Sequence, residues 1–125
     1  MNHGNKHWNL NRRAGHRKAL FLNLLKSLVL HKRIKTTLPK ARALRVFGER
    51  VITKAIHLLK LKDANKLAAY RNLLAWFHQD EVILRELIDV VAPKCAHRPG
   101  GYTRIVKLDI AHNAWAVIEL VDFYK

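Results

Sequence analysis

The first 48 residues of this chain contain no acidic residue, and the first carboxylate along the sequence is Glu49. The same stretch carries 12 of the 24 lysines and arginines, whereas the remaining 77 residues combine 12 basic residues with 9 acidic ones. A surface without anions cannot neutralise itself through internal ion pairs, so its natural counterion is a polyanion. Nucleic-acid phosphate is the commonest polyanion in a cell. The charge distribution therefore predicts nucleic-acid binding, concentrated in the N-terminal part of the chain.

Cysteine and long hydrophobic runs are also scarce. The single cysteine, Cys95, excludes an internal disulfide framework and fits a reducing compartment. No run approaches the ~20 apolar residues that cross a bilayer, and no hydrophobic region of a secretory signal follows the basic start. We therefore expect no membrane insertion. Half of the residues are hydrophobic, which is enough to build the core of one domain.

The usual signatures of enzymes and metal sites are missing from the sequence. It has no phosphate-binding P-loop, no GxSxG nucleophile elbow and no carboxylate pair beside a histidine. His3, His7 and His16 are near one another, but no cysteine or carboxylate accompanies them and their spacing matches no zinc pattern. We expect no enzymatic activity, no metal, no cofactor and no small-molecule substrate.

Residues 1–14 are polar and basic and show no apolar periodicity, which predicts an extended arm. Residues 15–125 are expected to form a single α+β domain. In it, apolar residues at helical spacing predict four helices. We expect these helices over residues 15–31 and 38–60, and after the N-caps Asp63 and Asp80. Pro93 is expected to end the last helix, because proline lacks a backbone N–H.

Three segments have the alternating pattern of strands rather than the periodicity of helices. They are residues 33–37, 105–110 and 115–123, and a turn around His112 and Asn113 would join the last two into a hairpin. Together the segments predict a small three-stranded mixed sheet backed by about four helices, which is an α+β fold.

The N-terminal arm combines cations with groups that can read unpaired bases. Arginine binds phosphate bidentately and lysine binds it as a point charge, while Trp8 can stack on a base. The candidate RNA contacts in this region are His3, Lys6, His7, Trp8, Arg12, Arg13, His16, Arg17 and Lys18. The alternative is a solvated tail without a partner, but such a density of like charge repels itself unless it is bound.

A second candidate site is the segment from Arg98 to Arg104, which reads RPGGYTR. Paired glycines let a backbone approach a ligand closely and leave N–H groups available to phosphate oxygens. The two arginines flank the turn, and Tyr102 can stack on a base. The alternative is a loop-to-strand junction whose glycines only satisfy a left-handed conformation. Physical reasoning leaves both interpretations open. The candidates are Arg98, Gly100, Gly101, Tyr102, Thr103 and Arg104.

Several of these stretches together resemble a known family. RRAGHRKAL at residues 12–20, IKTT at 34–37, RPGGYTRI at 98–105 and VIEL at 117–120 are similar to the bacterial-type large-subunit ribosomal protein L17 family. The resemblance covers essentially the whole chain. It implies an α+β fold, no catalytic residue, and binding to ribosomal RNA near the exit of the nascent-peptide tunnel, beside neighbouring large-subunit proteins.

Position by position, the resemblance extends the set of RNA contacts beyond the arm. It implies contacts at His3, Arg12, His16, Arg17, Lys18, Lys35, Thr36, Thr37, Lys40 and residues 98–104. Charge adds Lys32, Arg33, Arg42 and Arg45 to the candidates. A stand-alone nucleic-acid-binding regulator is the alternative function. It explains the charge but not the 98–104 loop.

The chain also departs from the family pattern. Asn2 replaces a usual arginine, Lys32 replaces a usual acidic residue, and residues 108–115 differ from the usual hairpin turn. Trp8 and Trp76 add to the divergence. These differences leave two locations open for the ribosome that holds this chain, the mitochondrial matrix and the bacterial cytoplasm.

Overall fold

The computed structural model describes residues 13–108 and 115–124. Most of the predicted arm and the predicted hairpin turn lie outside these residues. The helical elements are α1 (Ala14–His31), α2 (Leu38–Lys60), α3 (Asp63–Trp76), α4 (Glu81–Glu86), the π-helical turn η1 (Leu87–Val91), α5 (Ala92–Cys95) and the 3₁₀ turn η2 (Val121–Phe123). The strands are β1 (Arg33–Thr37), β2 (Thr103–Lys107) and β3 (Trp115–Leu120). The predicted α+β class is confirmed.

The three strands form one sheet in the order β1-β3-β2, with the C-terminal strand in the centre. The sheet is antiparallel throughout, so the prediction of a mixed sheet is wrong. The error has a topological cause. β1 enters the sheet far earlier in the chain, and its direction relative to the hairpin depends on how α2 returns the chain. A sequence pattern does not reveal that path.

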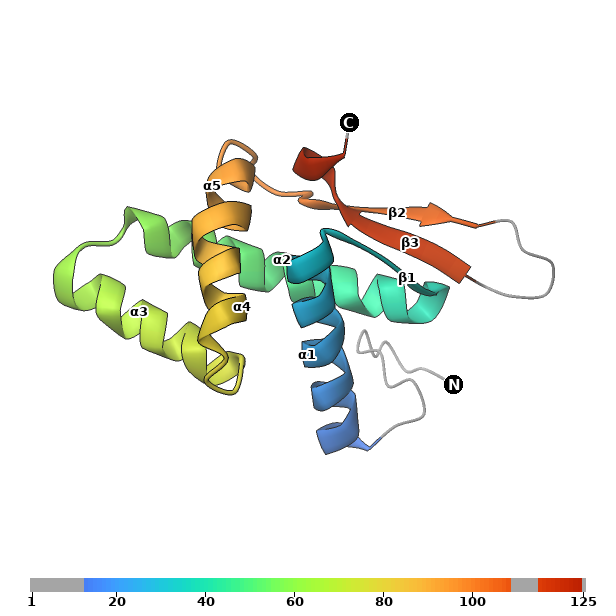
Figure 1. The fold of residues 1–125 in the computed structure, drawn as a ribbon, viewed down its shortest axis with the longest axis horizontal. Coiled ribbons are helices and arrows are strands. Elements are labelled where there is room, and N and C mark those ends of the chain that lie inside the picture. Colours follow the sequence, from blue (N-terminus) through green and yellow to red (C-terminus); the bar gives the residue numbers. More distant parts are fainter. Residues whose placement is uncertain (1–12, 109–114, 125) are drawn as a thin grey trace, which may run out of the picture.

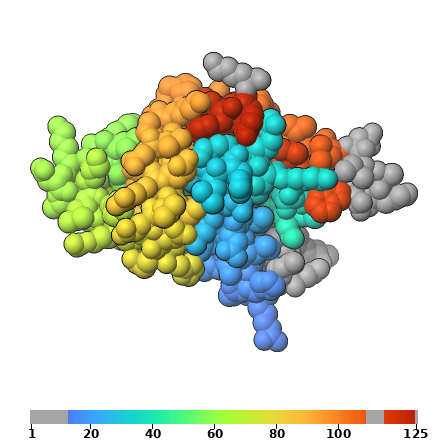
Figure 2. All heavy atoms as spheres, viewed as in Figure 1, coloured from blue at the N-terminus to red at the C-terminus, as the bar shows by residue number. Residues whose placement is uncertain are grey.

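The hydrophobic core lies where α1, α2 and the last helix meet the inner face of the sheet. Its fully buried side chains include Leu28, Leu44, Leu84 and Ile118, one from each of four elements. Figure 1 shows the sheet at one end of the molecule and α3 at the other, with α2 running between them. On the face seen in Figure 2, the helix formed by α4, η1 and α5 packs directly beside α1.

The last helix passes through Pro93 and ends at Cys95, so the prediction that Pro93 ends it is wrong. Proline removes one N–H donor and its ring crowds the carbonyl one turn earlier. The π-helical turn before Pro93 relieves this conflict, because the N–H of Ala92 bonds to the carbonyl of Leu87, five residues back. Widened turns of this kind are a known accommodation within helices.

The two predicted N-caps have different outcomes. The Asp80 carboxylate accepts a hydrogen bond from the N–H of Ile83 at 3.3 Å, which confirms it as the cap of α4. At α3 the cap position belongs to Lys62, and Asp63 is the first helical residue with a φ of 55°. Asp63 is therefore not the cap that the sequence predicts.

Lys32 closes α1 in a left-handed conformation with a φ of 66°, and its N–H donates to the carbonyl of Leu28 at 2.8 Å. Its ammonium turns inward to the carbonyl of Val29 and the carboxylate of Glu86. Glycine is the residue that usually occupies this position at a helix end. The side-chain contacts therefore hold a residue that is intrinsically disfavoured there.

Two substitutions of Lys32 separate the backbone contribution from the side-chain contribution. Lys32→Gly and Lys32→Ala both remove the ammonium, but only alanine keeps the left-handed strain. We expect the glycine variant to be more stable than the alanine variant by about 1 kcal/mol, measured by urea unfolding. Equal stabilities would show that the left-handed backbone carries no cost at this position.

Candidate nucleic-acid interface

The outer face of the sheet, which points away from the helices, displays a set of cations. In β1 the exposed Arg33 and Lys35 alternate with the half-buried Ile34 and the buried Thr36. Strand alternation therefore sends the charged residues outward and the inner residues toward the core. In β2 the exposed Arg104 lies on the same outer face, since it and Arg33 are both register partners of one central-strand residue.

That central residue is Glu119, and it holds both arginines. Arg33 Nε donates to Glu119 Oε2 at 2.8 Å, and Arg104 Nε donates to Glu119 Oε1 at 2.8 Å. The Glu119 side chain is only 5 % exposed, whereas the arginine side chains are 49 % and 44 % exposed. One buried anion thus fixes two cations from opposite edge strands, and the group keeps a net positive charge. We call Arg33, Glu119 and Arg104 the arginine ladder.

The charge state of Glu119 follows from its surroundings. Burial alone would raise its pKa, but hydrogen bonds from Arg104 and Arg33, together with their positive charges, outweigh burial and lower it below the ordinary 4.5. The residue is therefore ionised at neutral pH.

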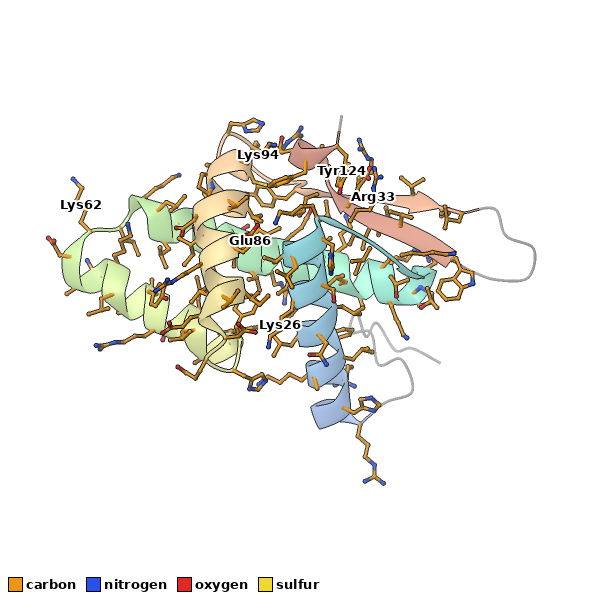
Figure 3. The ribbon with its side chains drawn as sticks, viewed as in Figure 1. Lys26, Arg33, Lys62, Glu86, Lys94 and Tyr124 are labelled. Carbon is orange, nitrogen blue, oxygen red and sulfur yellow. The ribbon has the colours of Figure 1, made fainter. Side chains whose placement is uncertain are left out.

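Aromatic rings accompany the cations on this face. The Arg33 guanidinium lies 3.8 Å from the centroid of the Tyr124 ring, and Figure 3 shows the two side chains together beside the sheet. The Tyr124 hydroxyl donates to the carbonyl of His31 at 3.3 Å, and its own carbonyl accepts from Arg104. Farther along, Lys35 lies 5.3 Å from the Trp115 ring. A sheet face that combines cations and aromatic rings is chemically suited to RNA.

The 98–104 loop is tied to the C-terminal turn. Arg98 Nε donates to both oxygens of Asp122, at 2.9 and 3.0 Å, and His97 lies 3.2 Å from the same carboxylate. Gly100 and Gly101 are exposed, and nothing lies within 4 Å of a Cβ built on either of them. Only Gly101 has a positive φ, of 66°, so the turn demands glycine there and the loop backbone remains open to solvent.

Two candidate residues of this loop face inward. Tyr102 is 3 % exposed and its hydroxyl donates to the carbonyl of Arg98 at 3.4 Å. Thr103 is 4 % exposed and donates through both its N–H and its hydroxyl to Glu49. In this conformation the Tyr102 ring has no free face for a base. Both side chains instead anchor the loop to the body of the protein.

The remaining candidates lie in several places. At the start of α1, Arg13, His16 and Lys18 are exposed and Arg17 is half-buried. At the start of α2, Arg42 and Arg45 are exposed, whereas Lys40 and the preceding Thr37 are half-buried. Lys32 is directed to Glu86, and Thr36 is buried. His3, Lys6, His7, Trp8 and Arg12 lie outside the described residues. Figure 1 shows the start of α1 at the end of that helix away from the sheet, so the α1 cations and the arginine ladder do not form one cluster.

Sequence reasoning missed the groups that position these cations. Glu119, Asp122 and Tyr124 bind the arginines but carry negative or no charge, so a search for positive residues passes over them. One signal in the sequence could have identified Glu119. Glu119 lies within the apolar run VIEL, and a carboxylate inside a buried strand requires partners.

The described residues give little support to a metal site, a cysteine nucleophile or a membrane span. No group of three or more histidine, cysteine or acidic residues there could hold a metal ion. Burial, with the negative charge of Asp122 adding to it, raises the pKa of the Cys95 thiol to about 12. A thiol with this pKa is not a nucleophile at neutral pH. Within residues 13–108 and 115–124, no helix combines the length and apolar character of a membrane span.

The structure thus defines a small basic α+β protein in which one buried carboxylate fixes two exposed arginines on a sheet. The chain belongs to the ribosomal protein L17 family, whose sequence model matches residues 20–121.

Three bacterial relatives illustrate the similarity, and each is named large ribosomal subunit protein bL17. The protein of Amoebophilus asiaticus is 47 % identical over 126 residues, covering 98 % of this chain and 61 % of the relative. That of Rickettsia bellii is 45 % identical, covering 98 % and 81 %, and that of Fusobacterium nucleatum is 42 % identical, covering 97 % and 100 %. This chain therefore spans less than two thirds of the first relative and all of the third. These relatives give no support to a mitochondrial location.

Proposed function

We propose that this chain is a structural constituent of the large subunit of a bacterial ribosome, where it binds ribosomal RNA near the polypeptide exit tunnel beside other large-subunit proteins. The observation that carries the proposal is the arginine ladder with its aromatic neighbours, in a chain of the ribosomal protein L17 family. The proposed role is non-enzymatic and requires no cofactor.

The outer sheet face binds phosphate with groups that are already in place. Glu119 occupies one edge of each guanidinium, and the Tyr124 carbonyl accepts a further hydrogen bond from Arg104. The N–H groups that these acceptors do not use are available to RNA. A side chain that is fixed before binding loses less conformational entropy when the complex forms. The Gly100–Gly101 backbone beside Arg98 offers N–H groups to a phosphate in the same way.

The α1 cations form a second contact region. Arg13, His16 and Lys18 are exposed where the chain enters α1, directly after the basic segment that the sequence predicts to bind RNA. Binding of that segment to RNA, with the ladder at the other end of α1, would let one small protein bridge separate RNA elements.

Sedimentation of the tagged chain from cell lysate tests the proposal. We expect co-migration with the large subunit that persists at moderate salt, and loss of co-migration when Arg33 and Arg104 are replaced by glutamine. Replacement of Lys60 and Lys62 by glutamine is the matched control, because it also removes two exposed cations, and Lys62 lies at the far end of the molecule (Figure 3). Recovery with chromosomal DNA instead would favour the stand-alone regulator.

A further inference from the structure

Trp76, at the end of α3, lies between two hollows on the surface of the helical region. One, of ≈ 260 Å³, is lined by residues of α2 and α3 that include Lys54 and His57. The other, of ≈ 220 Å³, is lined by residues of α1, α2 and α3 together with His78. We propose that these hollows form a second RNA site, in which an unpaired base stacks beside Trp76. The inference rests on the proposed function and adds a site that is separate from the sheet.

The indole belongs to a row of aromatic rings drawn from three helices. The ring centroids of Phe21 and Phe47 are 6.2 Å apart, and those of Phe47 and Trp76 are 5.4 Å apart with an interplanar angle of 37°. Phe47 supports the indole from within, and Trp76 remains 40 % exposed. An exposed ring that is supported on one side is a rigid platform for a base, because every base has a π-face.

The charges around the platform favour an anionic ligand. The ammonium of Lys54 lies 4.5 Å from the centroid of Trp76, and Lys18 lines the hollow on the α1 side. Among the described residues, no carboxylate lines either hollow. A nucleotide would place its base against the indole, and the exposed Lys54 ammonium would move to its phosphate.

A third hollow, on the other flank of α3, differs from these two in the charge of its lining residues. It is lined by Asp63 and Asp89 together with Lys66, and its carboxylates would repel a phosphate. The nucleotide site is therefore assigned to the two hollows around Trp76 and not to α3 as a whole.

The backbone that follows Trp76 is also unusual. His78 and Gln79 both have positive φ values, of 50° and 65°. Residues other than glycine adopt a positive φ at a cost in free energy, so the surrounding structure must hold them in this conformation. This strained turn brings His78 to the wall of the second hollow, which Lys18 also lines.

Tryptophan fluorescence tests the site in the full chain. Trp8→Phe and Trp115→Phe leave Trp76 as the only tryptophan, since the chain has three. Both are candidate RNA-binding positions, so phenylalanine keeps a ring at each, and the RNA affinities of this variant are first compared with those of the wild type. The probes are a short single-stranded oligouridylate and an adenylate–uridylate RNA duplex of the same length, both at low salt. We expect both RNAs to bind, but only the single strand to quench Trp76. Single-strand binding without quenching, or equal quenching by the duplex, would overturn the site and leave this face to a protein neighbour.

A substitution series adds an affinity measurement. Trp76→Leu should weaken single-strand binding about fivefold or more and leave duplex affinity unchanged, with Trp76→Phe intermediate. Leu67→Ser is the matched control, because Leu67 is 49 % exposed on α3 but lines neither of the two hollows. Circular dichroism verifies that each variant is folded. If neither RNA binds even at low salt, the proposed function fails and this inference fails with it. If both bind and Trp76→Leu changes nothing, only the inference fails.

Discussion

Replacing Glu119 by glutamine is expected to lower the free energy of unfolding by about 2 kcal/mol. The Glu119 side chain is 5 % exposed and its carboxylate accepts hydrogen bonds from two arginines, whereas glutamine supplies one acceptor oxygen without the charge. The loss is smaller than for a fully buried ion pair, because Arg33 and Arg104 are about half exposed and water can solvate them. Urea unfolding at neutral pH measures the change.

The same substitution should change how stability depends on pH. The pKa of Glu119 in the folded chain is lower than the ordinary 4.5. Its ionised form therefore stabilises the protein fully above pH 4.5, and this contribution is lost as the pH falls below 4.5 through the lowered pKa. The stability difference between the wild type and Glu119→Gln should accordingly shrink in that acidic range.

The control for this experiment is Glu81→Gln, at an exposed glutamate in the first turn of α4. It should change stability by only a few tenths of a kcal/mol. If the stability difference between wild type and Glu119→Gln stayed constant from neutral pH into the acidic range, the assignment of a lowered pKa to Glu119 would be wrong.

The second large effect concerns RNA affinity and salt. Simultaneous replacement of Arg33, Lys35 and Arg104 by glutamine should flatten the slope of log affinity against log salt concentration by roughly 2 to 3. This follows because each phosphate contact contributes about 0.7–0.9 to the slope. At low salt the variant should bind ribosomal RNA at least tenfold more weakly. Filter binding over a salt series provides both numbers.

A triple variant with the same charge change separates a specific surface from net charge. Lys60, Lys62 and Lys66 are exposed at the α3 end of the molecule, and their replacement by glutamine also removes three charges. We expect the salt slope of this control to remain close to that of the wild type. Equal flattening by both triple variants would contradict a binding surface on the sheet.

The presence of the helices and strands could be predicted from the sequence because local periodicity determines them. Two strand ends differ from the prediction, since β2 begins at Thr103 rather than Ile105 and β3 ends at Leu120, where the 3₁₀ turn η2 begins. Leu25, Leu28 and Val29 recur at helical spacing and are buried, and Arg33, Lys35 and Thr36 alternate as a half-buried strand does. These features depend on neighbours in the chain, so one sequence is enough to identify them.

Features that depend on partners distant in the sequence could not be predicted from local periodicity. Tyr102 was a candidate for base stacking, yet its ring is buried. Lys32 was a candidate RNA contact, yet its ammonium is directed to Glu86, 54 residues away in sequence. Glu119 appeared only as part of a matched motif, and its function as the clamp for two arginines depends on the strand order β1-β3-β2. The strand order and the packing of distant elements therefore determine which cations face solvent and which bind groups within the protein.

The central claim is that the outer sheet face binds RNA through the arginine ladder, and a cryo-EM map of the ribosomal particle that co-purifies with this chain tests it most directly. We expect the guanidinium groups of Arg33 and Arg104 to lie within hydrogen-bonding distance of RNA phosphates while Glu119 still bridges them. A map in which the outer sheet face contacts only solvent or protein would contradict the claim.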